Sequence, residues 1–229
     1  MLWDSPDLLA RCKRQAMEPD ISVTTIDDDW YAFLTEAEAH WKPVIAAHYP
    51  GPMYLAPMPL LQGANNKTFM FIDPDNQIPT PIIPIGQVEV YSGPSGRLLI
   101  PGAYWDRGAD YVTEGDTIRI TNGRSMTFAN GVPYARYVLP PGVIDANTSS
   151  GIKPDTLRIL LVYRALYSWA SRGGMQDPSF YRALEQKAAF GDPDIAGDVG
   201  LIGGLKLQNS AHGMAAYAHG YHGRWTHPV

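Results

Sequence analysis

The sequence has 229 residues, of which 45% are hydrophobic and 18% charged, and its formal net charge is −5 at pH 7. This composition predicts a folded protein with a sizeable core, and the acidic balance argues against general affinity for nucleic acid or anionic membranes. The single cysteine, Cys12, rules out an internal disulfide and suits a reducing compartment. No apolar run reaches the roughly 18 residues of a membrane span, and the acidic-then-basic N-terminus does not resemble a secretion signal.

The first fifty residues predict two helices. Residues 5–18 should form a short one, capped by Ser5, with Cys12 packed on its apolar face. Residues 27–48 should form a longer one, in which Pro43 is expected to cause a kink or an interruption. The apolar positions of this second helix recur at helical spacing. They are Trp30, Phe33, Leu34, Ala37 and Trp41.

Residues 51–153 predict a β-rich insertion, because proline and glycine are dense and β-branched runs are short. Alternation predicts a strand at 86–91, and Glu114–Gly115 predicts the turn of a hairpin spanning 111–121. Further strands are expected at 125–128 and 132–139. The prolines of 52–85 exclude most of that stretch from a central strand, so extended loops are expected there.

Residues 155–190 predict a second pair of helices with clear boundaries. Asp155 should cap the first and Asp177, followed by proline, the second, while Gly173–Gly174 and Gly191 should end them. The first of these helices is apolar on most sides, which is typical of a central helix. Its expected core includes Leu166 and Trp169, together with Trp41 of the earlier pair.

Two leucines of this central helix, Leu157 and Leu161, fall among the charged residues on its polar side. Apolar residues on an otherwise polar face are typical of a contact with another subunit. We therefore predict that Leu157 and Leu161 pack against a second copy of the chain.

Residues 197–229 show no lasting helix or strand period, so an extended C-terminal tail is predicted. Apolar and aromatic residues on such a tail are expected to dock on a partner. The predicted docking residues are Leu201, Ile202, Leu205, Leu207, Tyr217, Tyr221 and Trp225.

No catalytic constellation, cofactor motif or metal site is predicted. Glycines flank the histidines of the tail, and their spacing does not match a metal-binding helix pattern. Trp105 beside Tyr104 could form a sugar-binding platform, although sheet packing is the default for such a pair. The histidines are His212, His219, His222 and His227, and the aspartate groups interpreted as helix-start, turn and loop residues are Asp27–Asp29, Asp73 with Asp75, and Asp192 with Asp194 and Asp198.

The order of elements, two helices, a β-rich insertion, two helices and a tail, resembles the head–tail adaptor (connector) proteins of tailed bacteriophages. The resemblance rests on LLARCKRQAMEP and DDDWYAFLTEAEAHW near the start, and on LRILLVYRALYSWASRGGMQDPSFYRALEQKAAFGD later in the chain. It implies an α+β fold in which residues 1–50 and 154–196 form a four-helix adaptor bundle, residues 51–153 the β-rich insertion and residues 197–229 the tail. The insertion is longer than a simple adaptor hairpin.

The resemblance also implies a function: a structural, non-enzymatic virion protein at the head–tail interface, assembled in the host bacterial cytoplasm. It implies a ring, usually of about twelve copies, docked beneath the portal by the C-terminal tail. The insertion is expected to contact a tail or nozzle protein. An acidic channel would let viral DNA slide through without sequence-specific binding. The alternatives are a carbohydrate- or receptor-binding protein that uses Trp105, and a metal-dependent enzyme that uses the histidines.

Overall fold

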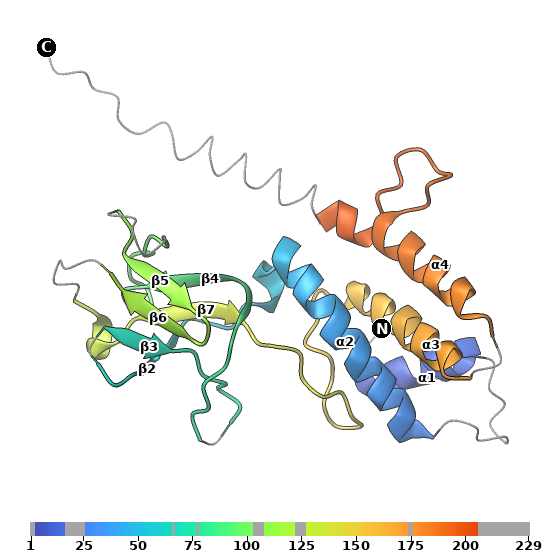
Figure 1. Cartoon of the computed structure of the whole chain (residues 1–229), viewed down its shortest axis with the longest axis horizontal. Coiled ribbons are helices and arrows are strands. Elements are labelled where there is room, and N and C mark those ends of the chain that lie inside the picture. Colours follow the sequence, from blue (N-terminus) through green and yellow to red (C-terminus); the bar gives the residue numbers. More distant parts are fainter. Residues whose placement is uncertain are drawn as a thin grey trace, which may run out of the picture. The chain divides into compact units, whose positions relative to one another are not determined.

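The computed structural model describes residues 3–16, 26–65, 67–76, 78–102, 108–121, 127–173 and 176–205. The fold is mixed α+β with two antiparallel sheets, which confirms the predicted class (Figure 1). The chain divides into two compact units. Unit 1 comprises Met1–Ala37, Ile144–Thr148 and Asp155–Val229, and unit 2 comprises Glu38–Val143 and Ser149–Pro154.

Unit 1 is built around one helix, α3 (Ile159–Ser171), which contacts α1 (Ser5–Ala16) and α4 (Pro178–Phe190). The Trp169 ring stacks on Trp30, with centroids 5.7 Å apart, and meets Tyr181 edge-on at 6.3 Å. Trp30 lies in the first part of α2 (Asp27–His48), so three helices surround α3. Leu166 and Trp169 are buried, which confirms that α3 is a central helix.

The helix boundaries of the N-terminal pair agree with the sequence, but two details differ. The Asp4 carboxylate accepts a hydrogen bond from the Asp7 N–H (3.0 Å), so Asp4 caps α1. The predicted cap, Ser5, is the first helical residue and is buried. The predicted interruption at Pro43 is also wrong, because α2 continues through it to His48.

Of the two predicted caps in the second helix pair, one is confirmed and one is wrong. Asp177 accepts a hydrogen bond from the Ser179 N–H (2.9 Å) at the start of α4. Asp155 makes no such cap, because a 3₁₀ turn, η3 (Asp155–Arg158), precedes α3 and the Asp155 carboxylate instead pairs with Arg158 at 3.2 Å.

Unit 2 contains both sheets, and three predicted strand regions are present in it. The predicted hairpin is β5 (Tyr111–Glu114) paired with β6 (Thr117–Ile120), and its turn places Gly115 at φ 65°, a conformation that favours glycine. The other two are β4 (Ile85–Tyr91) and β7 (Tyr134–Val138), which pair antiparallel with each other. Half of the strand predicted at 125–128, residues 125 and 126, lies outside the described residues, and Thr127 and Phe128 are not in a strand.

Three short strands lie in the stretch predicted to be loops. They are β1 (Met58–Pro59), β2 (Leu61–Gln62) and β3 (Thr68–Met70). The strand orders are β1-β7-β4 in one sheet and β2-β3-β6-β5 in the other. The chain passes from the first sheet to the second at Leu60, which is buried and donates its N–H to the Pro133 carbonyl (3.0 Å).

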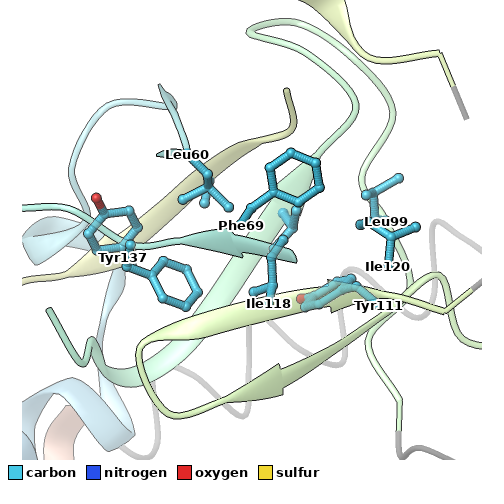
Figure 2. Packing of buried hydrophobic residues seen from close by; sticks show 10 residues of the cluster. Leu60, Phe69, Leu99, Tyr111, Ile118, Ile120 and Tyr137 are labelled. Atoms are coloured by element: carbon cyan, nitrogen blue, oxygen red, sulfur yellow. The ribbon is translucent and has the colours of Figure 1, made fainter. Parts of the chain in front are cut away.

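Side chains from both sheets meet in one hydrophobic core. Figure 2 shows the buried side chains of this core, which extend from the strands toward one another. The buried tyrosine hydroxyls in it donate to backbone carbonyls, Tyr137 to Ile72 at 2.5 Å and Tyr111 to Val88 at 3.2 Å. Both of these buried hydroxyl groups therefore have a hydrogen-bond partner. Its members are Leu60, Phe69, Phe71, Val90, Leu99, Tyr111, Ile118, Ile120, Ala135 and Tyr137.

The predicted tail begins differently from expectation. Residues 200–205 are helical, Ile202 is 0% exposed and Leu205 is 7% exposed. These two residues are buried in the chain itself, so they are not free to dock on a partner as predicted. The β-rich unit also begins earlier than residue 51, because the second half of α2 belongs to unit 2.

The two leucines predicted to form a subunit contact are also buried. Leu157 is 2% exposed and Leu161 is 0% exposed. The prediction assumed that both lie on an exposed polar face, but Leu161 in α3 and Leu157 in the preceding turn η3 are both covered within the chain. Neither leucine is exposed for a contact with another copy.

Candidate functional site

A pocket of about 300 Å³ lies in unit 2 and offers a candidate binding site. Its wall combines five apolar side chains with two lysines, a tyrosine and a carboxylate. Five segments of unit 2 contribute: α2, the 3₁₀ turn η1 (Gly51–Met53) with the residues after it, the end of β7, and two loops. The lining residues are Lys42, Pro52, Met53, Tyr54, Leu55, Asp75, Val138, Leu139, Gly151 and Lys153.

Lys42 is held in this wall by a buried ion pair with Glu38, one helical turn earlier in α2. Its Nζ lies 3.1 Å from Glu38 Oε1 and 3.1 Å from the Pro140 carbonyl oxygen, to which it donates. The side chains are 7% and 2% exposed. The opposite charges of Lys42 and Glu38 compensate each other away from water. The ion pair therefore holds the Lys42 side chain in place in the pocket wall.

Gly151 allows this packing because it has no side chain. A Cβ atom at this position would lie 2.6 Å from Lys42 Nζ, closer than side chains tolerate. The Gly151 N–H instead donates to Glu38 Oε1 at 3.4 Å. The other carboxylate oxygen, Glu38 Oε2, is buried and has no hydrogen-bond partner among the described residues.

Tyr54 forms part of the wall and belongs to a second cluster of polar groups. The guanidinium of Arg136 lies 5.1 Å from the centre of its ring, and Arg136 pairs with Glu89 at 3.6 Å. Burial raises the pKa of Tyr54 to about 12, and the negative charge of Glu89 contributes to the rise. Tyr54 is therefore neutral at physiological pH and presents a hydroxyl and an aromatic edge.

The arrangement suits recognition of a short aliphatic group beside an acidic one. Met53, Leu55, Val138 and Leu139 provide apolar contact area, and the exposed Lys153 provides a positive charge. The positive charge of Lys42 is already compensated by Glu38, so Lys153 is the side chain better placed to attract a carboxylate.

Most of the residues that the sequence proposed for docking or ligand binding lie outside the described residues. Of the docking residues predicted in the tail, only the half-buried Leu201 and the buried Ile202 and Leu205 are described. Trp105 and Tyr104 are outside as well. The remaining candidates outside the description are Leu207, Tyr217, Tyr221, Trp225, His212, His219, His222 and His227.

The aspartates have the structural positions that were predicted. Asp27–Asp29 begin α2, and Asp73 closes a turn by accepting from the Asp75 N–H at 3.0 Å. Within the described ranges, no three histidine, cysteine, aspartate or glutamate side chains gather as a metal site would need. Cys12 is buried, and burial raises the pKa of its thiol, as expected of a packed residue.

Among the residues that the structure describes, no helix has both the length and the apolar character needed to cross a membrane.

The pocket was not predicted from the sequence, although one signal for it is present in α2. Glu38 and Lys42 stand at i and i+4 between the apolar Ala37, Trp41 and Ile45 of the same helix. Opposite charges at this spacing within an apolar stretch indicate an ion pair that is buried rather than solvated. The contributions of Gly151 and Lys153, more than 100 residues later, have no counterpart in the local sequence.

No protein-family model matches this chain, and no curated protein matches it significantly.

Proposed function

We propose that the chain is a structural virion protein: a head–tail adaptor of a tailed bacteriophage that forms a ring beneath the portal and joins it to the tail. It acts without catalysis, and viral DNA passes through the ring. The proposal places the protein in the virion, after assembly in the cytoplasm of the host bacterium.

One observation carries the proposal: helices from both ends of the chain pack together, and the β-rich unit is inserted between them. α1 and the start of α2 meet α3 and α4 through the Trp30–Trp169 stack and through Tyr181, whose hydroxyl donates to the Gln15 carbonyl at 3.2 Å. This arrangement is what an adaptor core with an insertion requires. We propose that α1 to α4 correspond to the four-helix adaptor bundle.

Within this proposal, the C-terminal segment beyond Leu205 binds the portal. The helical turn at 200–205 anchors it, because Ile202 and Leu205 are buried. The candidate contacts are the remaining apolar and aromatic residues. They are Leu207, Tyr217, Tyr221 and Trp225.

The charge balance supports a channel for DNA. With a net charge of −5, the protein lacks the positive excess that would release counterions and hold the phosphate backbone tightly. The insertion, unit 2, is proposed to contact a tail or nozzle protein.

The test is binding to the portal protein that is encoded by the same viral genome. The full chain should co-purify with assembled portal, and a chain ending at Leu205 should not. Because this truncation keeps the buried Ile202 and Leu205, its thermal unfolding should match that of the full chain. Replacing the four tail histidines with asparagine is the matched control and should leave binding intact.

Two outcomes would overturn the proposal. Equal binding of the truncated and full chains would refute the docking role of the segment after Leu205. A full chain that does not bind portal at all would refute the adaptor function.

A further inference from the structure

The loop between α4 and the helical turn at 200–205 projects from these helices (Figure 1), and it carries exposed apolar side chains. Ile195 near its middle is 58% exposed, and Phe190 and Val199 at its base are 55% and 40% exposed. Monomeric proteins seldom keep several large apolar side chains together in solvent unless they have a partner.

The two ends of this loop are held together tightly. A Cβ on Gly191 would collide with the Asp198 carbonyl oxygen, so the two ends of the loop touch at its base. The Asp198 carboxylate accepts from the N–H groups of Asp192 (2.8 Å) and Gly200 (3.1 Å).

The tip of the loop is also held in place by hydrogen bonds. The Ile195 N–H donates to the Asp192 carbonyl at 3.0 Å, and the Asp198 N–H donates to the Ile195 carbonyl at 3.1 Å. Lys187 of α4 pairs with Asp192 at 2.8 Å. A loop ordered before binding loses little entropy on binding, which favours its use as a contact.

The pocket of unit 2 complements this loop in polarity, and one of its two exposed charges is positive. Its lining offers an apolar wall, the exposed Lys153 and the exposed Asp75, whereas the loop offers Ile195 beside the exposed Asp194. A volume of about 300 Å³ is at the small end of the range for ligand pockets and suits one or two aliphatic side chains rather than a large ligand.

We propose that residues 191–199 of one copy bind the pocket of unit 2 in a second copy. Ile195 would lie in the pocket and Asp194 would face Lys153. The two surfaces are different parts of the chain, so the contact is head-to-tail. Contacts of this kind generate closed rings when the rotation between copies allows closure. The inference rests on the proposed function, because an adaptor ring needs one such contact for each copy.

Disulfide trapping tests the contact directly. Ile195→Cys and Lys153→Cys are made as separate variants of the full chain, mixed and oxidised. Because Cys12 is buried, it should not react. A covalent dimer is expected only in the mixture, and Phe180→Cys, exposed on α4, replaces Ile195→Cys in the control.

Two further variants test the energetics through the self-association constant measured by analytical ultracentrifugation. Ile195→Asp should weaken self-association by about tenfold or more, because it places a carboxylate in the apolar wall. Ile78→Asp is the matched control, since Ile78 is 78% exposed in unit 2 and is not among the residues that line the pocket. Asp194→Lys should also weaken association, and adding Lys153→Asp should restore it.

The proposal is overturned if the mixture gives no more dimer than the Phe180→Cys control, or if Ile195→Asp and Ile78→Asp associate equally. A cross-link within a single chain carrying both cysteines, with none between chains, would also overturn it, because the loop would then bind its own pocket. These outcomes are independent of portal binding, so failure of this contact and failure of the adaptor function are distinguishable.

Discussion

Glu38 and Lys42 form an ion pair within α2 that is almost entirely removed from solvent, with Lys42 Nζ 3.1 Å from Glu38 Oε1. Lys42 is at the same time part of the pocket wall. Such a pair contributes little net stability relative to apolar residues of the same size, but removal of one partner leaves an uncompensated buried charge. The pair therefore makes the pocket wall sensitive to single substitutions.

Lys42→Met should lower the free energy of unfolding by about 3–5 kcal/mol, because it leaves the Glu38 carboxylate buried without its partner. The double variant Glu38→Leu with Lys42→Met should recover most of this loss. Urea unfolding of both variants measures the difference. A double variant as unstable as the single one would show that the buried charge is not the cause.

Trp169→Ala should lower the free energy of unfolding by about 3–5 kcal/mol, because it removes a buried ring that packs on Trp30 and Tyr181. Phe180→Ala, in which the lost ring is 55% exposed, should change it by less than about 1 kcal/mol. Thermal or urea unfolding compares the two. Similar losses in both variants would contradict the central position of α3.

Gly191→Ala and Gly197→Ala form a matched pair in the loop after α4. Both glycines have positive φ, 92° and 87°, so alanine at either site should cost about 1–3 kcal/mol in backbone strain. Only at Gly191 would the new Cβ also collide with the Asp198 carbonyl, which should add about 1–3 kcal/mol. Equal unfolding free energies for the two variants would show that the base of the loop is looser than described.

Protein stability should fall as the pH rises from about 10 to about 12. Burial raises the pKa of both Tyr54 and Tyr111 to about 12, above the ordinary value near 10, so the unfolded chain loses these protons first. The stability that this contributes is complete below pH 10 and is lost as the pH approaches 12. Tyr54→Phe should reduce the slope of the unfolding free energy against pH in this window, and an unchanged slope would contradict the assignment.

Elements with a strong local pattern could be predicted from the sequence. The hairpin at 111–121 follows from one glycine turn between β-branched runs, and α4 follows from Asp177 and Pro178 at its start. Strands β1 to β3 could not be predicted, because each has only two or three residues, and β1 and β3 pair with β7 and β6 far along the chain. The same applies to the turn at 200–205, which is ordered by burial of Ile202 and Leu205 rather than by a periodic pattern.

The pocket of unit 2 shows more clearly what cannot be predicted from local sequence. The charged pair of α2 was visible as Glu38 and Lys42, but the residues that complete the wall come from four other segments. Gly151 is required only because Lys42 Nζ lies where its side chain would be. A close approach of this kind depends on tertiary packing, which no window of local sequence contains.

The most direct test of the proposed adaptor function is electron microscopy of the full chain mixed with the portal protein from the same virus. A closed ring with one copy of this chain per portal subunit, located at the tail-facing side of the portal, is the expected result. Portal particles that remain bare, with this chain present as a monomer, would contradict the proposed function.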